Sequence, residues 1–395
     1  MTAHGAHYTL QEVTDFVKFC QNLGLEVIPL VQTFGHLEYV LKHKEFAHLR
    51  DVAEMPESIC PCHPETMEVI QDIIDQVMAV HTGANYLHIG CDEVYHLGEC
   101  QPCSLNMSTR NEIFVEHVSR VASYASTKYN LTPIVWDDML RNLIIEEMRP
   151  LAKLVEPMVW VYAPDVERFA PSYTWDRFNQ VFDYLWTASA FKGAHGETLV
   201  LPPLNKHLEN NLNWLALMRE EEPRLNGKFR GIVLTGWQRY DHFAVLAELL
   251  PAGIPSLAVN LLATTHGYFN DSLKPSFLAG LGCPEETNFY GGKYFDFDLD
   301  PYFFHKLSWC NFPGQRFYKV AVDLINTEEE INKFVKHVEI DKGWMTPYNA
   351  RHNMSSPYRI EQVRLPSRVS LLSRVFVFLS FLSFSALRCL DGSFF

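Results

Sequence analysis

The sequence has too few basic residues to balance its acidic ones. It carries 33 Lys and Arg against 47 Asp and Glu, which gives a formal net charge of −14. An acidic surface of this size repels phosphate backbones, so we expect no nucleic-acid partner. The uncharged run at 375–387 is shorter than the about 20 residues that a bilayer span needs, so we expect no membrane anchor either.

The amino terminus lacks the features of a secretory signal, because residues 1–7 contain neither a basic region nor an apolar core. The cysteines are odd in number and irregular in spacing, which argues against a disulfide framework and for a reducing compartment. Without a signal, the N-x-S/T sequons are expected to be chance matches. The nine cysteines are residues 20, 60, 62, 91, 100, 103, 283, 310 and 389.

The cysteines also lack the spacing of a metal site. Cys100 and Cys103 form a C-x-x-C pair, but no second pair of metal ligands stands at a matching distance along the chain. Cys60 and Cys62 with His63 make a weaker pattern still. The sequence therefore predicts neither a metal nor a redox site.

The first 265 residues alternate between short β-branched or aromatic runs and longer amphipathic stretches, which predicts βα units around a parallel sheet. The first helix begins with Thr9 and has Glu12 three residues later, a capping box. Strands are expected at 27–32, 86–90, 132–136, 158–162, 182–186 and 231–235, and helices at 9–23, 64–80, 109–129, 165–180, 205–222 and 241–250.

This rhythm indicates the α/β class and a (β/α)8 TIM barrel. A closed barrel needs eight strands and six are visible, so the barrel is expected to lack its first two strands, which would precede residue 1. We expect an N-terminally truncated barrel over 1–265, a helical or irregular extension over 266–363 and a low-complexity apolar tail over 364–395.

Polar and aromatic residues follow the predicted strands. In a (β/α)8 barrel the chemistry lies at the carboxyl ends of the strands. The repeated placement indicates a functional site rather than packing. The residues concerned are His36, Asp92, Glu93, Trp136, Asp137, Tyr162, Trp186, Trp237, Arg239, Tyr240 and Asp241.

The adjacent pair Asp92 and Glu93 is the strongest of these features. Where a strand ends and the chain turns, both carboxylates can reach one pocket, although such a pair can also lie on a loop or cap a helix. Two neighbouring carboxyls repel, so in a dry site one is expected to be partly protonated. A protonated acid beside an ionised partner is what glycoside cleavage needs.

The segment His88-Ile-Gly-Cys-Asp-Glu-Val94 resembles the H-x-G-G-D-E signature of glycoside hydrolase family 20, with Cys91 in place of the second glycine. The segments 31–36, 135–139, 188–193 and 234–242 extend the resemblance, which covers about 8–265 and is greatest to the hexosaminidase D branch.

The resemblance implies a β-N-acetylhexosaminidase that releases terminal non-reducing N-acetylgalactosamine or N-acetylglucosamine from glycans, without metal or cofactor. It implies a retaining reaction in which the substrate's own 2-acetamido oxygen is the nucleophile. Glu93 would protonate the leaving oxygen and then activate water, and Asp92 would orient the acetamido group. The branch also implies a cytoplasmic and nuclear location, and a homodimer is left open.

The other site residues have roles that the resemblance implies less firmly. His36 would set the proton of the acid or be a core histidine, and either Tyr162 or Tyr240 would donate to the acetamido oxygen. Arg239 and Asp241 would bind sugar hydroxyls or pair with each other. The expected pocket walls are Trp136, Trp186 and Trp237, and Asp137 would contact the sugar or act as a cap.

The sequence departs from the family at one point. The family's first two strands supply an arginine and an acidic residue that hold the outer sugar hydroxyls, and these would lie upstream of Met1. A catalytically inactive fragment that binds sugar or a partner is therefore an alternative. A second alternative is a barrel hydrolase with a metal held by His36 and Asp92, although no H-x-H pair marks a strand end.

Overall fold

The computed structural model describes residues 7–105, 108–284, 304–344, 346–354 and 356–358. The chain divides into two compact units, residues 1–277 and 278–395. The predicted tail over 364–395, with the uncharged run at 375–387, lies outside the described residues, and the boundaries at 265 and 363 stay predictions. Among the described helices, none has the length and apolar character needed to cross a bilayer.

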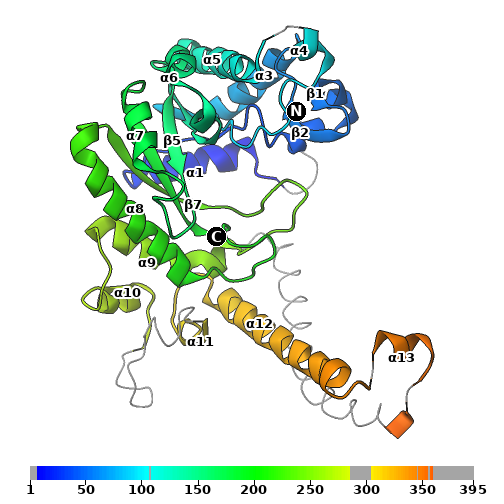
Figure 1. The fold of residues 1–395 in the computed structure, drawn as a ribbon. Coiled ribbons are helices and arrows are strands. Elements are labelled where there is room, and N and C mark those ends of the chain that lie inside the picture. Colours follow the sequence, from blue (N-terminus) through cyan, green and yellow to red (C-terminus); the bar gives the residue numbers. More distant parts are fainter. Residues whose placement is uncertain (1–6, 106–107, 285–303, 345, 355, 359–395) are drawn as a thin grey trace. The chain divides into compact units, whose positions relative to one another are not determined.

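The first unit is built on a parallel sheet in which each strand lies beside the next one along the chain (Figure 1). Strand Tyr86–His88 pairs with Thr132–Trp136 from the register Tyr86↔Thr132 onward. Sequential parallel pairing with helical crossovers is the pattern of a (β/α)8 barrel, so the α/β prediction is confirmed. The strands are β3 (Tyr86–His88), β4 (Thr132–Trp136), β5 (Glu156–Trp160), β6 (Leu185–Lys192) and β7 (Phe229–Gly236).

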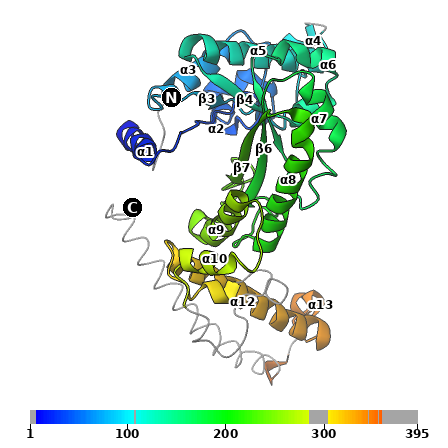
Figure 2. The ribbon, with the colours of Figure 1, turned by 90° about the vertical axis from the view of Figure 1, so that its left-hand side faces the viewer.

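Helices follow the strands and cover the sheet. Helix α8 packs against β6 and against α9, beside the central strands (Figure 2). The helices of the first unit are α1 (Leu10–Asn22), α2 (Glu38–Leu41), α3 (Thr66–Met78), α4 (Gln101–Leu105), α5 (Arg110–Tyr129), α6 (Ile145–Met148), α7 (Ser172–Asn179), α8 (Leu204–Leu225), α9 (Leu250–His266) and α10 (Lys274–Gly280), the last of which runs into the second unit.

The predicted strand at 27–32 is wrong as a strand. Leu30 makes a single parallel bridge to His88, with Val31 donating to the carbonyl of His88 and His88 donating to that of Pro29. Pro29 has no N–H to continue the ladder. The segment nevertheless lies beside β3 and leads into His36. The sequence also missed a short hairpin formed by β1 (Arg50–Val52) and β2 (Met55–Ile59).

Two predicted helices differ from the structure. The helix at 241–250 is wrong, because α9 begins only at Leu250 and the preceding residues are irregular. Asp241 accepts hydrogen bonds from the backbone N–H groups of Phe243 and Ala244, which favours a turn over a helix. The helix at 165–180 shortens to α7, because Pro171 precedes its first turn.

The second unit contains the remaining described helices and a disulfide between Cys283 and Cys310. The sequence argued against a disulfide framework, and this disulfide departs from that expectation. The other six cysteines among the described residues are free, and Cys389 lies outside them. The helices are α11 (Phe304–Leu307), α12 (Gln315–Lys336) and α13 (Pro347–Arg351).

Helix α5 offers a test of how its cap contributes to folding. Thr109 accepts a hydrogen bond from the N–H of Glu112, and the Glu112 carboxylate accepts one from the N–H of Thr109. Because α5 buries one face in the core, Thr109→Ala is expected to lower the free energy of unfolding by about 1 kcal/mol, measured by urea denaturation. Thr9→Ala removes the same motif from α1, which buries only Val17, and should have a smaller effect. Equal losses would contradict this account.

Candidate active site

The loop after β3 has a backbone that most residues avoid. Gly90, Cys91 and Glu93 have left-handed φ angles of 68°, 69° and 50°. A Cβ at Gly90 would lie 1.9 Å from the side-chain oxygen of Gln32, so any other residue would displace the side chain that donates to Asp92. Cys91 occupies the second glycine position of the signature, and its positive φ explains why glycine is usual there. Such a backbone persists only where the surroundings hold it in place.

The two carboxylates of the loop share one histidine. Nε2 of His36 lies 3.4 Å from Oδ2 of Asp92 and 3.4 Å from Oε2 of Glu93. Gln32 donates to the other oxygen of Asp92 at 2.9 Å, and the Tyr95 hydroxyl donates to the other oxygen of Glu93 at 3.0 Å. Each carboxylate is therefore held from two sides.

His36 reaches this position because its own loop approaches the catalytic loop closely. A Cβ at Gly35 would lie 2.6 Å from the backbone oxygen of Asp92, so only glycine allows the two loops to touch. His36 itself has a left-handed φ of 54°. Because the two loops touch, His36 contacts the two carboxylates and is not a core histidine.

The charges at this centre differ from the sequence-based expectation. Burial disfavours the charged form of His36, but hydrogen bonds to Asp92 and Glu93 outweigh it and raise the pKa of His36 to about 10. Burial alone would raise the pKa of Asp92, yet the bond to His36 holds it below its ordinary value. The same histidine lowers the pKa of Glu93. The expectation of a partly protonated member of the pair is wrong, because the proton lies on the imidazole between them.

A third carboxyl supports the loop from below. The Oδ2 atom of Asp138 accepts from the backbone N–H of Glu93 at 2.8 Å, and its Oδ1 accepts from the indole of Trp160 at 3.0 Å. Burial raises the pKa of Asp138 to about 7. Asp138 is thus the carboxyl that titrates near neutral pH here, and it holds the backbone of the catalytic loop.

These groups open into a cavity of about 480 Å³, in the range of ligand pockets. The Trp136 and Trp237 rings are tilted at 57° with centroids 6.0 Å apart, and the Trp237 indole donates to the Tyr162 hydroxyl at 2.9 Å. The cavity gathers most of the residues predicted from the sequence. They are His36, Asp92, Glu93, Trp136, Tyr162, Trp237, Arg239, Tyr240 and Asp241.

Comparison with known proteins agrees with this arrangement. The family described as glycosyl hydrolase family 20, catalytic domain, matches residues 1–167. Hexosaminidase D of Homo sapiens is 35% identical over 378 residues, which cover 93% of this chain and 74% of that protein. Hexosaminidase D of Bos taurus is 42% identical over 293 residues, covering 71% and 84%. The chain belongs to glycoside hydrolase family 20.

Among solved structures, a β-N-acetylhexosaminidase from Bacteroides fragilis is 16% identical and covers 71% of this chain and 55% of its own, with a TM-score of 0.49. Membership of family 20 makes the chain a glycoside hydrolase whose substrates are glycans. The five strands of the parallel sheet are then part of the family's (β/α)8 barrel.

Two residues predicted for the site do not line the cavity of this family 20 enzyme. Asp137 is fully buried and accepts two hydrogen bonds from Arg141, at 2.6 and 2.8 Å. Trp186 lies near the start of β6, not at its end, and its indole donates to Glu156 at 2.7 Å. The prediction failed for Trp186 because the strand begins at Leu185 and runs on to Lys192.

Arg239 and Asp241 lie at the cavity but do not form the ion pair that the sequence left open. Arg239 donates to the backbone oxygen of His242 at 2.9 Å, while Asp241 accepts from the backbone of its own turn. Tyr240 accepts from the N–H of Gly196 at 2.7 Å. Arg239 and Asp241 are therefore oriented by the backbone of the loop after β7, and Tyr240 by that of the loop after β6.

Several residues of the cavity and of its loops were not predicted from the sequence. Asp138 stands beside Asp137 after β4 but was not singled out; the chain turns there and directs Asp138 towards the catalytic loop. Tyr95, two residues after Glu93, carried no signal beyond its proximity. The further missed residues that line the cavity include Gln32, Glu38, Tyr39, Trp160, Ala194 and His242.

The shared histidine predicts a specific dependence of stability on pH. Because the folded-state pKa of His36 lies above its ordinary 6.5, its contribution is complete below pH 6.5 and is lost as the pH rises towards 10. The difference in free energy of unfolding between the wild type and His36→Gln should therefore shift between pH 7 and 10, with the wild type losing its relative advantage. His81→Gln, three residues beyond the end of α3, is the matched control. A constant difference for His36→Gln would contradict the ionic pairing.

Proposed function

We propose that the chain hydrolyses terminal non-reducing β-linked N-acetylhexosamine residues with retention, using the substrate's acetamido group as nucleophile. The observation that carries the proposal is the arrangement of Asp92 and Glu93, which face one cavity and share Nε2 of His36 at 3.4 Å. Adjacent carboxylates suit this reaction because one can face the leaving oxygen while the other faces the acetamide.

Glu93 is the proposed acid and base. In the free enzyme it is ionised, since His36 lowers its pKa. A sugar that fills the cavity removes water from Glu93, which raises the pKa of a carboxyl. The proton then moves from Nε2 of His36 to Oε2 of Glu93, and from there to the glycosidic oxygen as the bond to the anomeric carbon breaks. In the second step Glu93 takes a proton from the attacking water.

Asp92 is proposed to hold the acetamido group. Its pKa stays low because His36 and Gln32 donate to it, so it remains an anion through the reaction. An anion accepts a hydrogen bond from the acetamido N–H and stabilises the positive charge that develops as the acetamido oxygen bonds to the anomeric carbon. The oxazolinium intermediate is opened when water attacks the same carbon.

Tyr162 is the better candidate to donate to the acetamido oxygen. Its hydroxyl accepts from Trp237, which leaves its own proton for the substrate. The charges of Asp92 and Glu93 act on Tyr162, whereas Tyr240 interacts with Gly196 and Glu248. Trp136 and Trp237 would enclose the acetamido methyl, and Arg239 and Asp241 would contact outer hydroxyls.

Binding of sugar or of a partner without turnover is the second candidate. The described sheet is open at its β3 edge apart from the bridge at Leu30, and α1 exposes Phe16 and Phe19. Apolar side chains exposed together on one helix are typical of a surface that another chain covers. The kinetic measurements below separate the two functions.

The roles of the carboxylates are tested with 4-nitrophenyl N-acetyl-β-galactosaminide and its gluco epimer. Glu93→Gln is expected to lower kcat by about 10²–10⁴-fold, because it removes the proton donor and base. Glu68→Gln, an exposed residue on α3, is the control and should match the wild type. A folded wild type without turnover that still binds N-acetylhexosamine would favour the second candidate and reject the first.

The use of the acetamido group is tested by changing the substrate. Replacing the 2-acetamido group with a hydroxyl removes the nucleophile, so 4-nitrophenyl β-galactoside is expected to react at least 10²-fold more slowly than its acetamido counterpart. Asp92→Asn should lower kcat on the acetamido substrate and leave the slow hydroxyl substrate nearly unaffected. A similar loss on both substrates would argue against the acetamido role of Asp92.

A further inference from the structure

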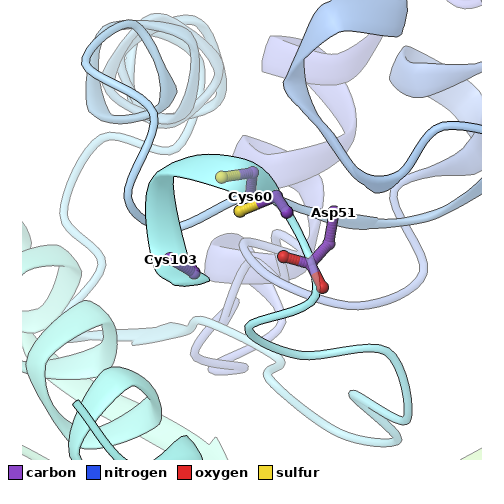
Figure 3. A group of neighbouring side chains, drawn as sticks. Asp51, Cys60 and Cys103 are labelled. Carbon is purple, nitrogen blue, oxygen red and sulfur yellow. The ribbon is translucent and has the colours of Figure 1, made fainter. Parts of the chain in front are cut away.

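Three cysteines and an aspartate that the proposed reaction does not use come together at one buried point. Asp51 lies on β1, Cys60 directly follows β2, Cys100 precedes α4 and Cys103 lies within it. One ligand atom from each lies within 4.8 Å of the others, and all four residues are buried. Figure 3 shows Asp51, Cys60 and Cys103 gathered beside the short helix α4.

Backbone contacts hold the four residues in place. The N–H of Glu99 donates to Oδ2 of Asp51 at 2.9 Å, which ties the segment before Cys100 to the hairpin. Cys60 donates its N–H to the carbonyl of Leu49, and Thr66 donates its hydroxyl to the carbonyl of Cys60. The cluster is thus a fixed feature of the fold.

One carboxylate oxygen of the cluster receives no hydrogen bond from an N–H or O–H group of the described residues. It is the buried Oδ1 of Asp51, and the Cys100 thiol, a weak donor, is the cluster side chain that interacts with this carboxylate. A buried carboxylate oxygen without a strong donor is costly, and native proteins rarely leave one in that state. This oxygen belongs to the same group as three thiols, whose sulfurs are ligands for soft divalent metals.

We propose that Asp51, Cys60, Cys100 and Cys103 bind one structural zinc ion. A tetrahedral zinc site has Zn–S distances of about 2.3 Å and Zn–O distances of about 2.0 Å, so its ligand atoms lie about 3.5–3.8 Å apart. The four ligand atoms already lie within 4.8 Å of one another, so the cluster would contract around the ion. As each Zn–S bond forms, the thiol releases its proton to solvent, and Asp51 binds as the carboxylate.

Four protein ligands leave no open position for water or substrate, so the site is structural rather than catalytic. Three thiolates select zinc over magnesium or calcium, which prefer oxygen ligands. Cys62 is assigned no ligand role. Its sulfur lies 2.6 Å from that of Cys103, but it does not belong to the mutually close group.

The zinc would fasten both loops of the catalytic centre. Residues 94–99 alone separate Glu93 from Cys100. On the other side, Ile59 donates its N–H to the carbonyl of Phe34, and Leu37 donates to that of Glu57, so the hairpin that leads to Cys60 also holds the loop of His36. A metal between Cys60 and Cys100 therefore supports the approach of His36 to Glu93.

The first test measures metal in the full chain purified without chelators. Mass spectrometry of the metal content is expected to give one zinc per chain, with at least a tenfold weaker zinc affinity in Cys100→Ser and Cys103→Ser. Cys20→Ser, on α1, is the matched control and should keep the metal. A folded wild type that contains no zinc and takes up none on dialysis would overturn the proposal.

A second measurement needs no variant and so does not depend on their folding. X-ray absorption at the zinc edge is expected to show three sulfurs at about 2.3 Å and one oxygen at about 2.0 Å. Cobalt in place of zinc should give sulfur-to-cobalt charge-transfer bands and the d–d bands of a tetrahedral ion. An absorption spectrum with four sulfurs and no oxygen would overturn the assignment of Asp51. In that case Cys62→Ser would lose zinc and Asp51→Asn would keep it. Disulfides among these cysteines in the chain as purified would overturn the site itself.

Discussion

The contact of one imidazole with two adjacent carboxylates is the interaction on which the centre depends. Without a cation between them, Asp92 and Glu93 would repel each other and one would have to hold a proton. His36 removes that conflict by carrying the proton itself, with Nε2 3.4 Å from each carboxylate. The resting site then has two anions and one cation, and the proton for the leaving group is stored one contact away from Glu93.

This contact requires a close approach of two loops, and their backbones are shaped for it. Gly35 lets the His36 loop touch the carbonyl of Asp92, and Gly90 lets the catalytic loop pass Gln32. His36, Cys91 and Glu93 all have positive φ angles. Residues in such conformations are less stable than in ordinary ones, so the surrounding hydrogen bonds have to compensate. Asp138 supplies one of them to the N–H of Glu93, which links the loop after β4 to the loop after β3.

The sequence predicted what depends on local periodicity and on motifs. The strand at 132–136 and the capped helices that start after Thr9 and Thr109 agree with the structure, because capping and buried apolar runs are local properties. Trp186 was assigned to the cavity because the end of its strand was placed several residues too early. The end of the strand before Asp137 was placed correctly, but the turn after it pairs Asp137 with Arg141 and directs Asp138 to the catalytic loop. The proton on His36 and the role of Asp138 could not be predicted, because both depend on distances between loops far apart in sequence.

The cysteine cluster shows the same limit more sharply. The C-x-x-C of Cys100 and Cys103 has no partner at a matching distance along the chain, since about forty residues separate it from Cys60. The hairpin β1–β2, too short to be predicted, brings Asp51 and Cys60 to it. The hairpin also holds the His36 loop through Phe34 and Leu37, while Cys100 follows the loop of Glu93. A metal ion bound by this cluster would therefore help to fix the distance between His36 and Glu93. The contact between these two residues would then depend on a site that touches no substrate.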